Sequence, residues 1–223
     1  MEENENSLFV LINVSYLNVL DIPSLTIGRG ITTIFGPSGS GKTTILKLLN
    51  RMISPSTGQL FFNGTELRQT NPVQHRRKVV MLSQNPVMFD GNIRDNLNAP
   101  NTFQKRPLLD ESLLFSALET VGLGKDPATP VNLLSGGEKQ RLALARVILL
   151  QPEVYLLDEP SSSLDDASAE AVVETLCLKA RKENRPVIMV THSKAIARKY
   201  SDVIITIAGG KSIGQELCSG RDN

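Results

Sequence analysis

Short apolar runs alternate with amphipathic stretches along this chain of 223 residues. The apolar runs lie at residues 8–14, 31–35, 79–82, 154–158, 186–191 and 203–207. Several are apolar at consecutive positions, which is typical of parallel strands that are covered on both faces. Between them, Leu, Ala and Val recur at spacings of three and four over residues 42–52, 137–150 and 168–184, which predicts helices. This alternation predicts an α/β fold with a mainly parallel central sheet.

The segment from residue 85 to residue 134 has a different composition. It carries two short amphipathic patterns, at residues 93–97 and 111–121. It also contains five of the twelve prolines of the chain: Pro86, Pro100, Pro107, Pro127 and Pro130. We expect these prolines to mark bends, because Pro breaks or kinks a helix interior. The segment is therefore predicted to form a small helical lobe inserted into the α/β body, and not a second independent domain.

Composition narrows the function classes. Apolar residues make up 40% of the chain, and the formal net charge is +1 with no basic half or tail. This argues against nucleic acid as a partner, because such binders cluster Lys and Arg. The two cysteines, Cys177 and Cys218, match no metal or disulfide framework. Together with the lack of an apolar leader after Met1, they favour a reducing cytosol, and no apolar run approaches the roughly 18 residues of a membrane helix. We expect a soluble chain with no direct membrane insertion.

A glycine-rich loop follows the apolar run at residues 31–35. Residues 36–43, GPSGSGKT, fill every position of the phosphate-loop pattern G-x-x-x-x-G-K-[ST], between a predicted strand and a predicted helix. Such a loop turns backbone N–H groups and a helix N-terminus towards phosphate oxygens. Lys42 is expected to reach the β- and γ-phosphates of a nucleoside triphosphate and Thr43 to ligate Mg²⁺. The alternative is an ordinary Gly/Ser turn. The predicted nucleotide-binding residues are Gly36, Pro37, Ser38, Gly39, Ser40, Gly41, Lys42, Thr43 and Thr44.

Two acidic residues end the apolar run VYLLDEP. Asp158 and Glu159 would lie at the carboxyl end of this strand, where open α/β sheets bind their ligands. We expect Asp158 to hold Mg²⁺, and Glu159 to orient and deprotonate the attacking water. Alone, an Asp-Glu pair could simply start a solvated helix, but together with the phosphate loop it indicates a hydrolase site.

The stretch LSGGEKQR, at residues 134–141, predicts a second anion site. Ser135, Gly136 and Gly137 precede a helical pattern, so a hydroxyl, small residues and a helix N-terminus come together. An ordinary N-cap by Ser135 with Glu138 at the third helical position is the alternative, and it is compatible with anion binding. One nucleotide could be bound by both devices if the second comes from another copy of the chain.

Over residues 8–208, the chain resembles the ATP-binding subunit of an ATP-binding cassette (ABC) transporter. It carries these motifs and several further ones in the order in which the family has them. Gln84 in MLSQNPVMF matches the family's Q-loop glutamine. LSGGEKQR matches its signature, Asp165 in SSSLD its D-loop aspartate, and His192 in VTHS its switch histidine. The segment NPVMFDGNIRDNL resembles exporter-type cassettes, and the whole chain resembles small stand-alone cassettes of metal (iron) exporters.

The resemblance implies a mechanism in which two chains pack head to tail around two ATP molecules. One chain contributes Lys42 and Thr43, with Gln84 at the γ-phosphate and Mg²⁺. The same chain contributes Asp158, Glu159 as general base, and His192 on the γ-phosphate. The other chain contributes Ser135 and Gly137. We therefore expect a homodimer in the ATP-bound state, with ATP and Mg²⁺ bound. His75, in the charged run HRRK, is expected to be solvated and to have no catalytic part.

The family usually stacks adenine on an aromatic residue near the first strand, and Tyr16 is the candidate. The segment between Tyr16 and the phosphate loop is short, so a core position at the end of the strand is the alternative. The fifty residues between Gln84 and Ser135 are also compact, which points to a small docking surface for a membrane partner.

The resemblance also implies the fold and the location. We expect a P-loop NTPase fold as a single domain over residues 1–223. Its body would comprise residues 1–84, with an N-terminal antiparallel β portion, and residues 151–223. Residues 85–150 would form the helical signature lobe. The chain leaves no room for membrane helices, so we expect the permease to be a separate transmembrane subunit, with this chain peripheral on the cytoplasmic face of the cell membrane.

Three function classes compete. The first is a transport ATPase that drives a membrane permease. The second is a soluble cassette of an assembly scaffold, such as the iron–sulfur type. The third is a P-loop kinase or another monomeric NTPase, which would leave LSGGEKQR without a purpose. A neighbouring gene for a polytopic membrane protein would favour the first class, and neighbouring scaffold genes the second.

Overall fold

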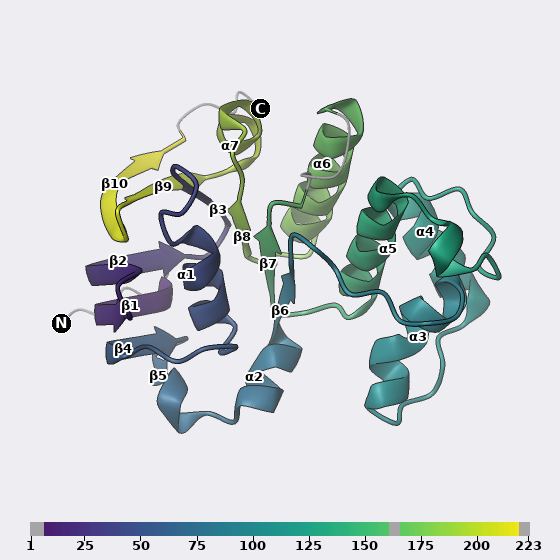
Figure 1. The fold of residues 1–223 in the computed structure, drawn as a ribbon, viewed down its shortest axis with the longest axis horizontal. Coiled ribbons are helices and arrows are strands. Elements are labelled where there is room, and N and C mark those ends of the chain that lie inside the picture. The colour runs from purple at the N-terminus through teal and green to yellow at the C-terminus, as the bar shows by residue number, and fades with distance from the viewer. Residues whose placement is uncertain (1–6, 161–165, 219–223) are drawn as a thin grey trace.

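The computed structural model describes residues 7–160 and 166–218, and it confirms the α/β fold (Figure 1). The strands are β1 (Ser7–Tyr16), β2 (Leu20–Gly28), β3 (Ile31–Phe35), β4 (Thr57–Phe62), β5 (Thr65–Glu66), β6 (Val79–Leu82), β7 (Val154–Asp158), β8 (Val187–Val190), β9 (Val203–Ala208) and β10 (Lys211–Leu217). The helices are α1 (Lys42–Leu49), α2 (Pro72–Lys78), α3 (Ile93–Phe103), α4 (Glu111–Thr120), α5 (Gly136–Leu149), α6 (Asp166–Lys182) and α7 (Lys194–Tyr200). Two short 3₁₀ turns are η1 (Leu67–Gln69) and η2 (Val131–Leu133). Each predicted strand and helix is present, with ends that differ by a few residues.

The central sheet is mainly parallel, as expected. Its strand order is β10-β9-β3-β8-β7-β6, with β10 antiparallel at one edge. The register pairs Ile34 with Val190, Val190 with Asp158, and Leu157 with Leu82. Strands β3, β8, β7 and β6 therefore end at the same edge of the sheet. The loops that leave these four strands start side by side there, which is where α/β sheets bind ligands.

Strand β7 shows why the sheet could be recognised from apolar runs. Val154 and Leu156 belong to one core cluster, whereas Tyr155 and Leu157 belong to another. Successive side chains of a strand point to opposite faces, so both faces of β7 are covered. The first cluster includes residues of α1 and of the antiparallel sheet β2-β1-β4-β5, which is the N-terminal β portion expected from the sequence. The second cluster includes residues of α3, α4, α5 and α6.

The helices between β6 and β7 pack together on one side of the molecule (Figure 1). Buried apolar residues of α3, α4 and α5, among them Leu97, Leu114 and Leu142, lie in the same cluster as Tyr155 of β7. The core of this insert is thus continuous with the core on one face of the central sheet. Pro100 lies inside α3 instead of at a bend.

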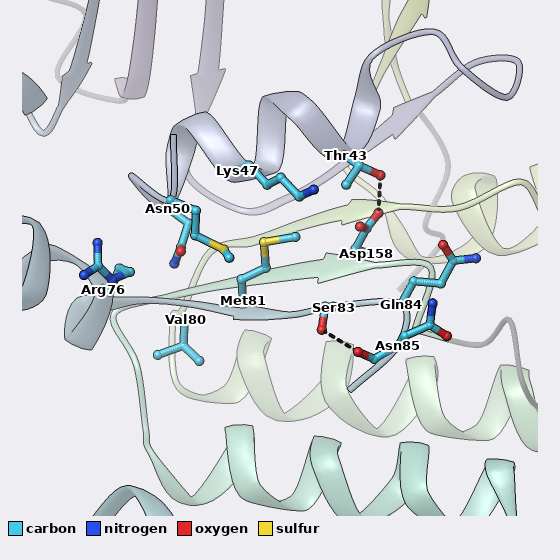
Figure 2. Close-up of a pocket in the computed structure, with 11 residues that line it drawn as sticks. Thr43, Lys47, Asn50, Arg76, Val80, Met81, Ser83, Gln84, Asn85 and Asp158 are labelled. Carbon is cyan, nitrogen blue, oxygen red and sulfur yellow. Dashed lines mark hydrogen bonds between the residues drawn. The ribbon is translucent and has the colours of Figure 1, made fainter. Parts of the chain in front are cut away.

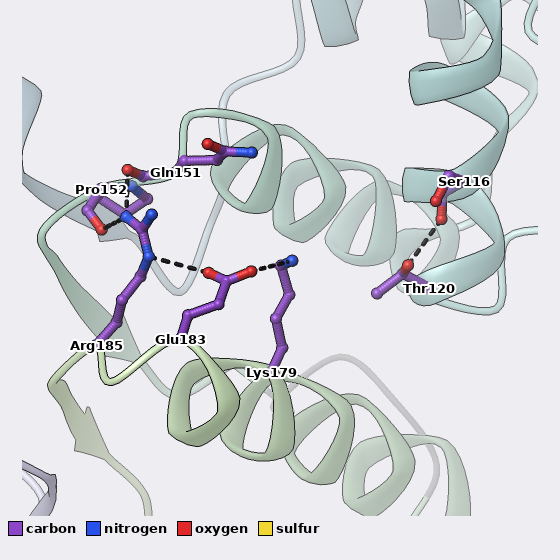
Figure 3. Close-up of polar contacts among 7 residues, drawn as sticks. All are labelled: Ser116, Thr120, Gln151, Pro152, Lys179, Glu183 and Arg185. Carbon is purple, nitrogen blue, oxygen red and sulfur yellow. Dashed lines mark hydrogen bonds and ion pairs between the residues drawn. The ribbon is translucent and has the colours of Figure 1, made fainter.

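A polar cluster at the end of α6 fixes the start of β7 (Figure 3). The Arg185 guanidinium donates hydrogen bonds to the carbonyl oxygens of Gln151 and Pro152, just before β7. Glu183 accepts from Lys179 Nζ at 2.6 Å, and its other oxygen lies 2.9 Å from Arg185 Nε. These contacts join α6 to the connection between α5 and β7. They therefore help to hold the strand that carries the acidic residues of the site.

The expectation that His75 is solvated is wrong. On α2, Gln74, Arg77 and Lys78 are exposed, but the His75 side chain points inward and is 3% exposed. His75 Nε2 lies 2.7 Å from the carbonyl oxygen of Leu49, at the end of α1, and its ring meets Phe62 edge-on. Burial lowers the pKa of His75, although the hydrogen bond to Leu49 opposes the shift. A single inward position in a polar helix has no apolar periodicity, which is why the sequence pattern did not show it.

Candidate nucleotide site

The phosphate loop, residues 36–41, joins β3 to α1 at the carboxyl edge of the sheet. Two positions of this loop require glycine, because a side chain there would clash with a neighbouring segment. A Cβ on Gly36 would lie 2.0 Å from the carbonyl oxygen of Ile207. A Cβ on Gly41, whose φ is +99°, would lie 2.5 Å from Leu20 Cδ2. The loop can therefore curl tightly before α1, and it leaves the first N–H groups of that helix free for an anion.

Lys42 is the cation inside this loop. Its side chain is buried, and Nζ donates hydrogen bonds to the carbonyl oxygens of Gly36 at 2.9 Å and Pro37 at 2.8 Å. Burial lowers the pKa of Lys42, and the nearby Glu159 and Asp158 carboxylates oppose that shift. The hydroxyl of Ser40 is also buried and has no hydrogen-bond partner among the described residues. An ammonium group and an orphaned hydroxyl in one curled loop fit a polyanion such as a nucleoside triphosphate.

One cavity of about 270 Å³ brings most of the predicted site together. Beside Val19, it is lined by Ser38, Gly39, Ser40, Gly41, Lys42, Thr43, Thr44, Gln84, Glu159 and His192. These residues come from the loop after β3, the start of α1, and the loops after β6, β7 and β8. Gly36 and Pro37 do not line the cavity and contact Lys42 through their carbonyl oxygens. Segments far apart in the chain thus meet where the register of the sheet places their ends.

Thr43 and Asp158 form a pair of oxygen groups suited to Mg²⁺ (Figure 2). Thr43 Oγ1 donates a hydrogen bond to Asp158 Oδ1 at 2.9 Å. Burial raises the pKa of Asp158, whereas the hydrogen bond from Thr43 opposes the rise. The described residues contain no group of three or more His, Cys, Asp or Glu that could hold a metal. A site with only a few protein ligands, all of them hard oxygen atoms, fits Mg²⁺, because this ion usually keeps waters and substrate phosphates as its other ligands.

Glu159 is the centre of a second set of contacts. Its carboxylate accepts a hydrogen bond from Gln84 Nε2 at 3.0 Å, and its other oxygen lies 2.8 Å from His192 Nε2. The backbone N–H of Glu159 donates to the carbonyl oxygen of Val190 at 3.0 Å, and its φ is +47°. A positive φ is uncommon for a residue other than Gly, and such residues often occur at functional sites. The carboxylate is therefore held from two sides, by the loops after β6 and β8.

A neighbouring cavity of about 480 Å³ lies beside this site (Figure 2). It shares Thr43 and Gln84 with the first cavity, and Asp158 also lines it. Figure 2 shows Gln84 and Asn85 near Asp158 and Arg76 towards the far end, where α2 borders the cavity. Gln84 thus lies at the junction of the two cavities.

The signature residues lie apart from this cavity, in the helical insert. Ser135 caps α5: its hydroxyl accepts from the Glu138 N–H at 3.3 Å, and the Glu138 carboxylate accepts from the Ser135 N–H at 2.8 Å. Ser135 and Gly136 are exposed, Gly137 is half-buried, and none of the three lines the cavity that contains Lys42. The exposed start of α5 is open to a ligand from outside this copy of the chain.

Of the two remaining predicted site residues, the structure describes Tyr16 but not Asp165. Tyr16, at the end of β1, is half-buried against the core cluster beneath the antiparallel sheet and does not line the cavity. Val19, in the turn between β1 and β2, lines the cavity, and sequence reasoning missed it because a valine in a short turn carries no motif. Tyr16 as an adenine-stacking residue stays a prediction. Asp165 lies outside the described residues.

Within the described ranges, 7–160 and 166–218, no helix is both long enough and apolar enough to span a membrane.

The chain is similar to known proteins in sequence and in fold. A family model described as "ABC transporter" matches residues 20–162. The "Probable iron export ATP-binding protein FetA" of Escherichia coli (strain K12) is 35% identical over 213 residues, which cover 93% of this chain and 93% of that protein. "Protein STAR1" of Oryza sativa subsp. japonica is 36% identical over 198 residues. That match covers 87% of this chain but 55% of the rice protein, so the chain spans about half the length of this relative.

A solved structure is similar in fold. It is a dimeric ATP-binding cassette in a post-hydrolysis state, bound to ADP and Pi. The two chains superpose with a TM-score of 0.83 at 24% sequence identity, over 96% of this chain and 100% of that one.

Proposed function

Because the chain belongs to the ABC transporter family of ATPases, we propose that it hydrolyses ATP to drive a separate membrane permease, through head-to-tail dimerisation. The likeness to FetA confirms the expected resemblance to metal-export cassettes, and it supports export of a metal as the transport task. The observation that carries the proposal is one cavity lined both by the phosphate loop with Lys42 and by the cluster of Glu159, Gln84 and His192. A site for phosphates and a held carboxylate in one cavity is what hydrolysis of a terminal phosphate requires.

Binding of the triphosphate falls to the loop and the start of α1. The Lys42 ammonium exchanges its contacts with the carbonyl oxygens of Gly36 and Pro37 for the β- and γ-phosphates. The N–H groups at the start of α1 and the Ser40 hydroxyl supply further hydrogen bonds to phosphate oxygens. Thr43 and Asp158 would hold Mg²⁺, with Gln84 beside them, and the ion would neutralise charge on the phosphates.

Glu159 acts as the general base. Its carboxylate accepts a proton from the water that attacks the γ-phosphorus, and ADP and inorganic phosphate are the products. Gln84 and His192 fix the orientation of that carboxylate through the contacts at 3.0 and 2.8 Å. General-base catalysis of this kind contributes about 10²–10⁴-fold to the rate.

The surfaces that we assign to partners lie outside the nucleotide cavity. The exposed start of α5, with Ser135, Gly136 and Gly137, would close on the γ-phosphate held by a second copy, together with Asp165.

The 480 Å³ cavity beside the site would receive a cytoplasmic segment of the permease, because it is open and lined by Lys47, Arg76 and the exposed Met52. Gln84 contacts Glu159, the general base, and borders that cavity, so it would transmit docking of the permease to catalysis. The chain would work at the cytoplasmic face of the cell membrane.

Purification of the tagged chain from solubilised membranes tests the proposal. We expect a polytopic membrane protein to co-purify with the chain and to stimulate its ATP turnover. Gln84→Ala should reduce that stimulation more than it reduces ATP affinity, whereas Tyr200→Phe, a change in α7 away from both cavities, should leave the stimulation intact. Recovery of the chain only with non-membrane assembly proteins would contradict the transport function.

A further inference from the structure

The start of α5 carries a carboxylate close to the N–H groups that we propose for binding a phosphate. Glu138 is the third residue of the helix, and its Oε2 accepts a hydrogen bond from the Ser135 N–H at 2.8 Å. The N–H groups of Gly136 and Gly137, the first two of the helix, have no acceptor within the helix and remain for an anion. A helix N-terminus is equivalent to roughly +0.5 elementary charge, so an unpaired carboxylate in the first turn outweighs this attraction.

Lys125 lies beside this carboxylate. It belongs to the loop between α4 and η2, and its Nζ lies 3.2 Å from Glu138 Oε1. The two oxygens of Glu138 are thus engaged separately, Oε2 by Ser135 and Oε1 by Lys125. The hydrogen bond from the Ser135 N–H and the contact with Lys125 hold the pKa of Glu138 below its ordinary value. The carboxylate is therefore charged at neutral pH, and the Lys125 ammonium is its counter-ion.

The backbone around Lys125 is anchored on both sides. Leu123 is buried in the core cluster that also contains residues of α5, and its N–H donates to the carbonyl oxygen of Leu118 at 2.9 Å. The Lys125 N–H donates to the carbonyl oxygen of Leu123 at 2.9 Å. On the other side, the Asp126 carboxylate accepts from the Ala128 N–H at 2.7 Å. The ammonium group thus reaches α5 from a loop that is tied to the core of the helical insert.

The second capping box of this insert lacks such a cation. Asn92 and Asp95 form it at the start of α3, with the Asn92 N–H donating to Asp95 Oδ2 at 3.0 Å. Among the residues that the structure describes, no Lys, Arg or His forms an ion pair with Asp95. Arg94 beside it pairs with Glu111 instead. Capping a helix therefore does not by itself require a cation on the carboxylate, and the Lys125 contact calls for another reason.

We infer that Lys125 is a positioning residue for the composite site, which the start of α5 in one chain and the Lys42 cavity of another would form. Its ammonium holds and neutralises the Glu138 carboxylate, so that this carboxylate does not repel the γ-phosphate bound to the second chain. The inference rests on the proposed head-to-tail dimerisation. A charge in the first turn of a helix changes an interaction there by about two- to fivefold, and a symmetric dimer contains two such sites. Loss of the ammonium should therefore weaken the dimer by about fourfold or more.

Sedimentation equilibrium of Glu159→Gln with saturating MgATP measures the dissociation constant of the dimer. Adding Lys125→Met keeps the aliphatic stem and removes the ammonium, so the dimer should weaken by about fourfold or more, whereas Lys125→Arg should retain it. Arg94→Met is the matched control, because it removes the cation from another exposed ion pair of the same insert and should leave the dimer unchanged. Calorimetry with MgADP should give the same affinity in every variant, since Lys125 does not line the nucleotide cavity.

The background Glu138→Gln separates neutralisation of Glu138 from direct contact with the phosphate. The Gln amide oxygen can still accept from the Ser135 N–H, but it carries no charge, so Lys125→Met should weaken the dimer no further. A loss of equal size in both backgrounds would show that Lys125 acts on the phosphate itself. That result, or an unchanged dimer in Lys125→Met, would overturn the inference and leave the proposed dimer standing. An ATP-bound monomer in Glu159→Gln alone would overturn the proposed dimer, and the inference with it.

Discussion

At the scale of single residues, we propose that Lys42 binds the phosphates and Glu159 activates the attacking water. Lys42 is a nearly buried cation whose hydrogen bonds go to its own loop, and Glu159 is a carboxylate held by two other loops. A buried ammonium is costly unless it is paired, and carbonyl oxygens pair with it less well than phosphate does. The loop is therefore arranged to exchange carbonyl contacts for a triphosphate.

Lys42→Ala should lower ATP affinity by about tenfold or more, because a hydrogen bond to a charged group contributes about 1.5–3 kcal/mol. Lys47→Ala is the matched control: it lies further along α1, does not line the nucleotide cavity, and should retain ATP binding. Calorimetric titration with MgATP measures both. Equal ATP affinity in the Lys42→Ala variant and the wild type would refute the assignment of the loop.

His75 makes the stability of the fold depend on pH. Burial lowers the pKa of His75 below its ordinary value of about 6.5, so the unfolded chain binds the proton more readily than the folded chain. The contribution of neutral His75 to the free energy of unfolding is therefore complete above pH 6.5 and is lost as the pH falls below it. The slope from this group is at most about 1.4 kcal/mol per pH unit.

Urea unfolding of the wild type, His75→Gln and His192→Gln between pH 7.5 and pH 5 tests this. The chain has two histidines, and His192 is exposed, so His192→Gln should keep the pH dependence and His75→Gln should lose part of it. Identical slopes in all three proteins would show that His75 is not the group responsible.

At the scale of elements, the sequence predicts best those strands whose two faces are both buried. Strands β7 and β8 are apolar at successive positions and could be recognised directly. Strand β2 alternates buried and exposed residues, and β10 is largely exposed at an edge, so neither forms an apolar run. The phosphate loop was predicted from its motif, but the meeting of Gln84, Glu159 and His192 follows from strand order and register. Only the family resemblance pointed to it, since no local periodicity encodes which strands are neighbours.

Helix α5 begins at a capping box for which we propose a second use, in binding the γ-phosphate of a partner chain's ATP. Ser135→Ala removes the hydroxyl that accepts from the Glu138 N–H and should lower the free energy of unfolding by about 1 kcal/mol. Asn92→Ala is the matched control, because Asn92 forms the equivalent capping box at the start of α3, with the Asp95 N–H 2.9 Å from its side chain. Both variants should lose similar stability in urea, and both should bind ADP like the wild type. Only Ser135→Ala should also slow ATP turnover; equal turnover in the two variants would mean that Ser135 serves the helix alone.

At the scale of the whole molecule, the two phosphate-binding sites that we propose for one chain do not meet. The loop with Lys42 opens into a cavity at the edge of the central sheet, whereas the start of α5 lies in the helical insert and does not line that cavity. The near-zero net charge leaves no strong repulsion between two copies. We propose that the two sites act on one ATP only across a pair of chains.

Size-exclusion chromatography of Glu159→Gln with and without MgATP tests this proposal. The substitution keeps the size of the side chain but removes the proton acceptor, so ATP should remain uncleaved and bridge two chains. We predict an ATP-dependent dimer for Glu159→Gln and for Glu159→Gln with Asn92→Ala. With Ser135→Arg added instead, the bulky side chain should block the partner's γ-phosphate, so that the protein binds ATP but elutes as a monomer. A dimer that persists in the Ser135→Arg variant, or an ATP-bound monomer in Glu159→Gln alone, would contradict the claim.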